Sequence, residues 1–174
     1  MAERLELLCQ AWLSCGESLG YKARLALKEQ FPSAAELFRQ FPVSVRDIAG
    51  DKAYHELAAL RDKGLDKLEE ALRRADIRLS VPGDGLFPEL LTRIEDPPEL
   101  LFYQGVLKAD ETRAIAMVGS RRETRYGREQ AFAIARDLAA QGVTIVSGLA
   151  RGIDTAAHLG ALEAGGRTIA ILGS

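Results

Sequence analysis

The chain has 174 residues, 47% of them hydrophobic, and a formal net charge of -2. This length can bury one sizeable core or two small ones, so we expect an ordinary globular chain of one or two domains. A charge this close to zero excludes a protein that coats nucleic acid or an anionic membrane over its whole surface. Any anion-binding site must therefore be local.

The cysteines and the first residues indicate the cellular compartment. Cys9 and Cys15 are too few and wrongly spaced for a zinc site or a disulfide framework, which favours reduced core thiols and a cytoplasmic location. The opening Met-Ala-Glu-Arg-Leu-Glu has neither the apolar run of a signal peptide nor a membrane span. We expect no metal site and no membrane partner.

Residues 1–75 are predicted to form a small helical domain. Apolar residues recur there at helical spacing with no strand pattern, and the last helical stretch is interrupted at Gly64. Further breaks fall at Gly16, Gly20, Pro32 and Pro42. The turn at residues 16–20 also allows a helix-hairpin-helix whose amides hold a DNA phosphate, but a helical packing module is the preferred interpretation.

The hydrophobic period changes near Asp76, and residues 77–81 alternate as a strand does. Later, strands and helices alternate, with strands at 114–118, 143–147 and 168–172 and helices at about 126–140 and 154–163. This order predicts a right-handed parallel β-α-β-α-β unit, and the continuously apolar strands indicate helices on both faces. Because the third strand runs directly into Gly173 and Ser174, we expect a truncated sheet.

Two glycine-bearing turns directly follow the first two of these strands. The first is Val118–Arg121 and the second is Ser147–Asp154. Each precedes a predicted helix start, where unpaired N–H groups and the helix dipole stabilise anions. Since the carboxyl ends of parallel strands meet at one edge, the two turns indicate a single shared crevice.

The first turn lies in a basic stretch. Residues 113–128 contain five arginines and one acid, a local charge of about +4 that can neutralise phosphates. Arg121 follows Gly119 and Ser120 at the strand end, where its guanidinium can bind phosphate and stack on a base. The alternative is an ion pair with Asp154 that holds the two turns together. Three further arginines are more typical of a solvated helix face: Arg122, Arg125 and Arg128.

In the second turn, Ser147 and Gly148 let the backbone approach a ligand, and Arg151 adds a charge at the mouth. Asp154 lies where an N-cap is expected, with its carboxylate accepting the first free helix amides. His158 is four residues further on the same helix face. An acid–base dyad is conceivable, but no nucleophile or metal-ligand set accompanies it. A His158 bonded to Asp154 that braces the loop is preferred.

A series of motifs, unbroken in order and spacing from about residue 76 onward, carries a family resemblance. The motifs are Ile77–Val81, Phe87–Leu91, Asp96–Gly105, Val118–Arg121 with Tyr126-Gly127, Ser147–Asp154 with Ala157-His158 and Ala161-Leu162, and Gly166–Ala170. They resemble the successive blocks of the DNA-processing protein A family. The resemblance implies an α/β chain with a sterile-alpha-motif-like helical domain over 1–75. A partial Rossmann-like parallel sheet with flanking helices follows over 76–174, truncated at its C-terminal side.

The resemblance also implies a function. Members of this family are bacterial cytoplasmic proteins that bind and protect single-stranded DNA in natural transformation. They help to load the recombinase RecA onto it, with no catalysis and no cofactor, and they commonly form homodimers as full-length proteins. In the family the arginine at the place of Arg121 belongs to the DNA pocket. Arg167 stands where a basic residue often lies near the DNA, and its alternative is an ordinary edge charge.

The rival from another class is a Rossmann-like nucleotide-binding enzyme. The first turn lacks the second and third glycines that let a pyrophosphate approach, and the second strand ends in Ser147-Gly148 instead of a ribose-binding acid. These features disfavour NAD. A phosphoribohydrolase that cleaves nucleoside monophosphates stays open as an alternative, because its glycine-rich catalytic motif would fall beyond Ser174.

Overall fold

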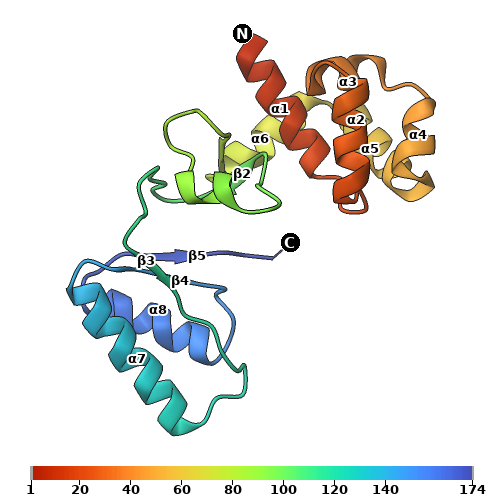
Figure 1. The fold of residues 1–174 in the computed structure, drawn as a ribbon. Helices are drawn as coiled ribbons and strands as arrows, with labels where there is room; N and C mark the ends of the chain where they lie inside the picture. The colour runs from red at the N-terminus through yellow and green to blue at the C-terminus, as the bar shows by residue number, and fades with distance from the viewer. Residues whose placement is uncertain (1, 174) are drawn as a thin grey trace. The chain divides into compact units, whose positions relative to one another are not determined.

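The computed structural model describes residues 2–173 and divides into two compact units, Met1–Ala109 and Asp110–Ser174 (Figure 1). The first unit contains α1 (Ala2–Ser14), α2 (Tyr21–Gln30), α3 (Ala34–Gln40), α4 (Ser44–Ala49), α5 (Asp51–Lys63), α6 (Leu65–Arg74), β1 (Arg78–Ser80), the 3-10 helix η1 (Glu89–Arg93) and β2 (Leu101–Tyr103). The second unit contains β3 (Ala114–Ala116), α7 (Arg125–Ala140), β4 (Thr144–Ser147), α8 (Ile153–Glu163) and β5 (Thr168–Ala170). The chain is thus α/β, with a helical first part and a parallel sheet, as predicted.

Trp12 lies at the centre of the first unit's core. The residue is 1% exposed, and its ring makes edge contacts with Phe38 and Phe41, at centroid distances of 5.0 and 5.6 Å. The indole N–H donates to the carbonyl oxygen of Leu57 at 3.0 Å, so the buried polar atom has a partner. Each large apolar side chain buried here stabilises the fold by about 1.5–3 kcal/mol.

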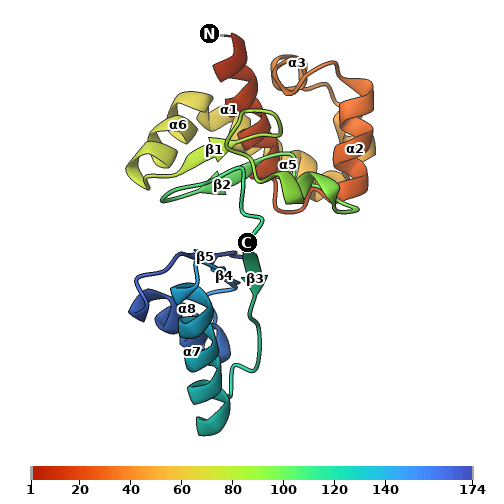
Figure 2. The same cartoon turned by 60° about the vertical axis from the view of Figure 1, so that its left-hand side comes forward.

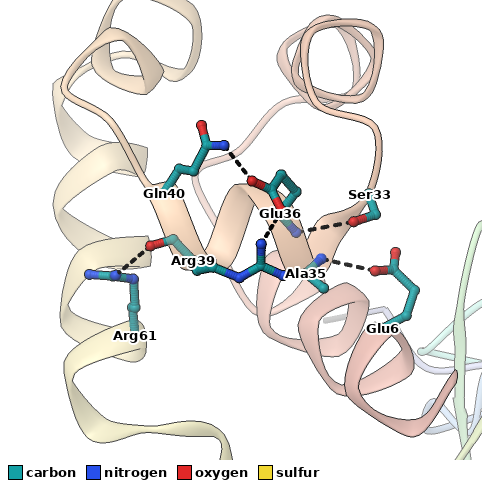
Figure 3. A network of polar contacts seen from close by, with 7 residues as sticks. All are labelled: Glu6, Ser33, Ala35, Glu36, Arg39, Gln40 and Arg61. Atoms are coloured by element: carbon teal, nitrogen blue, oxygen red, sulfur yellow. Dashed lines mark hydrogen bonds and ion pairs between the residues drawn. The ribbon is translucent and has the colours of Figure 1, made fainter. Parts of the chain in front are cut away.

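The seven-residue helix α3 is capped at both ends by side chains from other helices (Figure 3). Glu6 of α1 accepts hydrogen bonds from the amides of Ala34 and Ala35, both at 2.9 Å. Arg61 of α5 donates to the carbonyl oxygens of Phe38 and Arg39 at the other end. A carboxylate at the N-terminus and a guanidinium at the C-terminus both complement the helix dipole, which stabilises a helix too short to persist alone.

The interruption predicted at Gly64 is confirmed. This residue ends α5 and precedes α6 with a φ of +85°, a conformation that glycine adopts without strain.

The turn at residues 16–20 is held internally, because Ser18 donates from its amide and hydroxyl to the carboxylate of Glu56 at 2.9 and 2.6 Å. These bonds keep the pKa of Glu56 below its ordinary value. A helix-hairpin-helix would need the Ser18 amide free for phosphate.

Strands β1 and β2 pair antiparallel, with Leu79 opposite Phe102. By its contacts, the stretch 76–109 belongs to the first unit. The sequence places a domain boundary after residue 75 because the helical pattern ends there. That boundary differs from the division of the contacts after Ala109 and stays a prediction.

In the second unit the strand order is β3-β4-β5 and both pairs are parallel. Figures 1 and 2 show α7 and α8 on the same face of this sheet, so the expectation of helices on both faces is not met by these two helices. The reason is topological: two successive crossovers of the same hand, each moving one strand further in the same direction, place their helices on one face.

Small residues bring α7 and α8 close together. The core beneath the sheet consists of Ile145 and four alanines, at positions 135, 139, 157 and 161. Gly160 of α8 lies directly against α7, and a Cβ there would overlap the carbonyl oxygen of Phe132. The unit therefore depends on close backbone approach more than on bulky side chains. Among residues 2–173 no helix combines the length and apolar character needed to span a bilayer.

Candidate nucleic-acid interface

The loops after β3 and β4 touch each other at the carboxyl edge of the sheet. The amide of Ile153 donates to the carbonyl oxygen of Ser120 at 3.2 Å. Gly152 has a φ of +89°, and a Cβ at this position would overlap the same carbonyl oxygen. Only glycine allows this approach. Residues 118–124 and 148–152 therefore form one continuous surface, called the two-loop surface below.

Gly119 is needed for packing inside this surface. A Cβ on Gly119 would lie 2.7 Å from Cγ1 of Ile153, closer than real Cβ contacts allow. Thr124 then caps α7, because its hydroxyl oxygen accepts from the amide of Gly127 at 3.0 Å. Gly119, which belongs to the turn predicted to bind DNA, thus makes room for the side chain of Ile153, the first residue of α8.

Arg121 and Arg122 lie on a tight turn that Ser120 stabilises, since the Ser120 hydroxyl accepts from the Arg122 amide at 3.0 Å. Both arginines are exposed. Within residues 2–173, no ion pair or hydrogen bond involves either guanidinium. The alternative ion pair between Arg121 and Asp154 is therefore not formed. Arg125, the first residue of α7, pairs with Glu129 at 2.7 Å.

Asp154 organises the second loop. Its Oδ2 accepts from the amides of Gly148 at 3.1 Å and Ala150 at 3.4 Å. The expected N-cap role is wrong, because Gly152 occupies the N-cap position and Asp154 is the second residue of α8. From there its carboxylate points back to the loop and not to the helix amides. The same oxygen explains why position 148 is a glycine, because a Cβ at that position would lie only 3.0 Å from Oδ2.

Ser147 is buried, and its hydroxyl donates to the carbonyl oxygen of Met117 at 2.6 Å. This side chain therefore joins β4 to the end of β3. Leu149, two residues later, is 58% exposed with a φ of +55°. This left-handed conformation costs a non-glycine residue about 1–2 kcal/mol, and the bonds from Asp154 to both neighbours of Leu149 hold it in place.

His158 bonds to Thr168 of β5 instead of Asp154. Its Nδ1 lies 2.6 Å from the Thr168 hydroxyl oxygen, which itself donates to the carbonyl oxygen of Ile145 at 2.8 Å. Because that hydroxyl proton is already used, Nδ1 must be the protonated nitrogen. The residue is 6% exposed, and burial lowers the pKa of His158 while the charge of Asp154 opposes the shift. His158 thus joins α8 to the sheet.

Arg167 is separated from the other predicted DNA-binding residues. It precedes β5 and so lies at the amino edge of the sheet, opposite the two-loop surface. There its guanidinium forms an ion pair with Glu111, with Nε 2.6 Å from Oε1. Glu111 also accepts from the Thr144 hydroxyl at 3.0 Å. In a parallel sheet, residues that precede a strand lie at the amino edge and residues that follow a strand lie at the carboxyl edge. Arg167 and the two-loop surface are separated for this reason.

Arg151 is exposed and lies where the two-loop surface meets the helices. Together with Arg128 it lines a groove of about 650 Å³ between α7 and α8. Phe132 and Leu159 form the apolar part of this groove. Within residues 2–173, no cluster of three or more histidine, cysteine or acidic side chains could hold a metal ion.

Two residues of this region were missed in the sequence as binding candidates. Tyr126 is 72% exposed at the second position of α7, and Leu149 is held outward by the second loop. An aromatic residue interleaved with arginines is a signal for nucleic-acid binding that could have drawn attention to Tyr126. No local signal marks Leu149, because its conformation depends on Asp154.

A parallel sheet whose first two loops join into one exposed, arginine-bearing surface at the carboxyl edge of its strands defines a Rossmann-like fold. Residues 78–174 match the family model of DNA recombination-mediator protein A, and the chain belongs to this family.

Individual relatives agree with this assignment. The DNA processing protein DprA of Streptococcus pneumoniae is 44% identical over 91 residues, covering 52% of this chain and 32% of that protein. Protein Smf of Escherichia coli is 44% identical over 95 residues, covering 54% of this chain and 25% of the relative. The chain therefore spans a quarter to a third of the length of these two relatives. The X-ray structure of DprA from S. pneumoniae matches with a TM-score of 0.61 and 28% identity, over 94% of this chain and 56% of that one.

Proposed function

We propose that the two-loop surface binds single-stranded DNA through its phosphates. The observation that carries the proposal is the state of Arg121 and Arg122, which are exposed beside a helix start and lack a carboxylate partner among residues 2–173. Such guanidinium groups can form charge-assisted, bidentate hydrogen bonds with phosphate. Membership of the recombination-mediator family supports DNA as the source of that phosphate.

The location, oligomeric state and biological role that we propose rest on family membership. We propose that the full-length protein is a cytoplasmic homodimer that protects single-stranded DNA and loads RecA onto it during transformation and recombination. Sedimentation of the full-length protein tests the dimer. RecA filament growth on DNA with and without the protein tests the loading, and an unchanged growth rate would contradict it.

A role without catalysis or cofactor is part of the same proposal. His158 was the residue with the chemistry for proton transfer, but its ring is buried and its Nδ1 bonds Thr168. A general base must lie within hydrogen-bond reach of the proton that it abstracts. Incubation with nucleoside monophosphates, with release of the free base measured, tests the rival phosphoribohydrolase. Base release by the pure protein would favour that enzyme.

The decisive experiment on DNA binding is fluorescence anisotropy of a labelled single-stranded oligonucleotide across a salt series. We expect Arg121→Ala to weaken binding and to reduce the slope of log affinity against log salt by about 0.7 for each phosphate that the variant no longer binds. Arg136→Ala is the matched control, since Arg136 is exposed on α7 beyond the two-loop surface and pairs with Asp137. It removes the same charge from the same unit.

Three outcomes of the anisotropy experiment separate the possibilities. A loss in Arg121→Ala that Arg136→Ala does not share supports the site. Equal losses of affinity in both variants would show that binding depends only on net charge, which would contradict a specific site at Arg121. Displacement of the oligonucleotide by low concentrations of a mononucleotide would move the assignment to a nucleotide-binding protein.

A further inference from the structure

Tyr126 is the aromatic side chain with the largest exposed fraction in residues 2–173, at 72%. It is the second residue of α7 and directly follows the two-loop surface. A Cβ on its neighbour Gly127 would lie 3.6 Å from Cδ1 of Ile153, so this turn of α7 packs beside the start of α8, which directly follows the second loop. The phenol ring is therefore exposed to solvent beside the two-loop surface that carries Arg121 and Arg122.

Leu149 is a second exposed apolar side chain of the same surface, and it is held there at an energetic cost. Its φ of +55° is unfavourable for leucine, and 58% of the residue is exposed. Asp154 accepts hydrogen bonds from the residues on both sides and so imposes this conformation. A strained backbone that leaves an apolar side chain in solvent is an observation that points to a ligand.

Apolar groups beside unpaired arginines match one ligand class in particular. The charges of Arg121, Arg122 and Arg151 complement phosphates, whereas the ring of Tyr126 and the side chain of Leu149 complement the faces of nucleobases. In a duplex those faces are covered by neighbouring base pairs. In a single strand they are accessible, so contacts of this kind distinguish the single strand from the duplex.

We propose that Tyr126 and Leu149 are the base-contacting residues of the two-loop surface, with Tyr126 stacking on an unpaired base and Leu149 packing against a second one. This inference rests on the proposed DNA function and adds to it the origin of the preference for single strands. The arginines bind phosphates of any nucleic acid, and these two side chains supply the selectivity.

An oligonucleotide with abasic sites separates base contacts from phosphate contacts. We expect the chain of 174 residues to bind an ordinary single strand more tightly than an abasic strand of equal length. Tyr126→Ala should weaken binding of the ordinary strand about 5- to 150-fold, the range that corresponds to stacking on one base. It should leave the abasic strand and the salt slope nearly unchanged. Tyr126→Phe should retain the affinity, since stacking needs the ring and not the hydroxyl.

Tyr21→Ala is the matched control for the ring. Tyr21 is 46% exposed on α2 of the first unit, and its neighbours Asp96 and Glu99 are acidic. We expect no change in DNA affinity for this variant. An equal loss in Tyr21→Ala and Tyr126→Ala would overturn the assignment of Tyr126.

Leu149→Gly tests the second contact without the risk of unfolding. Glycine adopts the left-handed conformation freely, so the variant should keep or raise the melting temperature. Its affinity for the ordinary strand should nevertheless fall, with the abasic strand unaffected. Unchanged affinity would overturn the role of Leu149.

The inference and the proposed function fail in different ways. If the wild type binds neither strand, or if Arg121→Ala leaves the salt slope unchanged, the DNA function of the surface is contradicted. If the wild type binds both strands equally well and Tyr126→Ala matches it, phosphate binding stands and the base contacts are overturned.

Discussion

The carboxylate of Asp154 lies 3.1 Å from the amide nitrogen of Gly148, six residues earlier in the chain, and this hydrogen bond sets the shape of the second loop. Asp154 is 6% exposed, and its removal leaves two partly buried amides without an acceptor. We expect Asp154→Ala to lower the free energy of unfolding by about 1–3 kcal/mol and to weaken DNA binding through the displaced loop. Urea denaturation measures the first effect and anisotropy the second. Asp154→Asn keeps one acceptor oxygen and should lose less, and equal stability of all three proteins would contradict the role.

The buried His158 predicts a pH dependence of stability. Burial lowers the pKa of His158 in the folded state below its ordinary 6.5, so at acidic pH the unfolded chain binds the proton more readily. Stability is therefore fully present above about pH 6.5 and falls as the pH drops from there through the folded pKa. The melting temperature of the wild type should decline over this window.

His158→Gln, which does not titrate, provides the control for that decline. The difference in melting temperature between wild type and variant should shrink as the pH is lowered. A constant difference from neutral to acidic pH would show that His158 does not carry the pH dependence.

Gly160 should tolerate no side chain. A Cβ there overlaps the carbonyl oxygen of Phe132 and forces α8 away from α7. Overpacking of this kind costs about 1–3 kcal/mol, so Gly160→Ala should lower the melting temperature clearly. Gly20→Ala is the control, because a Cβ on Gly20 would meet no atom within 4 Å and the φ of -66° suits alanine. Thermal denaturation of the two variants should separate them, and similar losses would contradict the packing argument.

Arg167 and Arg121 should respond in opposite ways to replacement by alanine. Arg167→Ala leaves Glu111, whose side chain is 11% exposed, without its ion-pair partner. We expect a loss of stability of about 1–3 kcal/mol, reduced by the partial exposure of the pair, with little change in DNA affinity. Arg121→Ala should show the reverse, since its guanidinium contacts no carboxylate among residues 2–173. Weakened DNA binding by a fully stable Arg167→Ala would restore Arg167 to the binding surface.

Much of this arrangement follows from local patterns. The apolar periodicity located the helices and the parallel strands, and the position of glycine after each strand located both turns. The contact between the turns was predictable as well, because the carboxyl ends of neighbouring parallel strands share one edge. Ser120 and Ile153 meet for that reason.

The internal partners of the candidate residues were not predictable. Ser147 bonds Met117 30 residues away, and Arg167 pairs with Glu111 56 residues away. A serine, an aspartate or an arginine beside a glycine turn has the same chemistry whether it faces a ligand or a distant backbone group. The sequence pattern therefore could not separate loop residues that bind from loop residues that support.

The sequence by itself determined the order of strands and helices, the two glycine turns, the basic stretch that contains Arg121 and the family resemblance, since each is expressed in residues close together in the chain. Only the tertiary structure decided that α7 and α8 share one face of the sheet and that Asp154 holds the second loop. It also decided that His158 bonds Thr168 and that Tyr126 and Leu149 stay exposed. These features depend on which distant donors, acceptors and apolar surfaces come into contact once the chain has packed. Local periodicity does not predict such contacts, because it reflects only residues that are close together in the sequence.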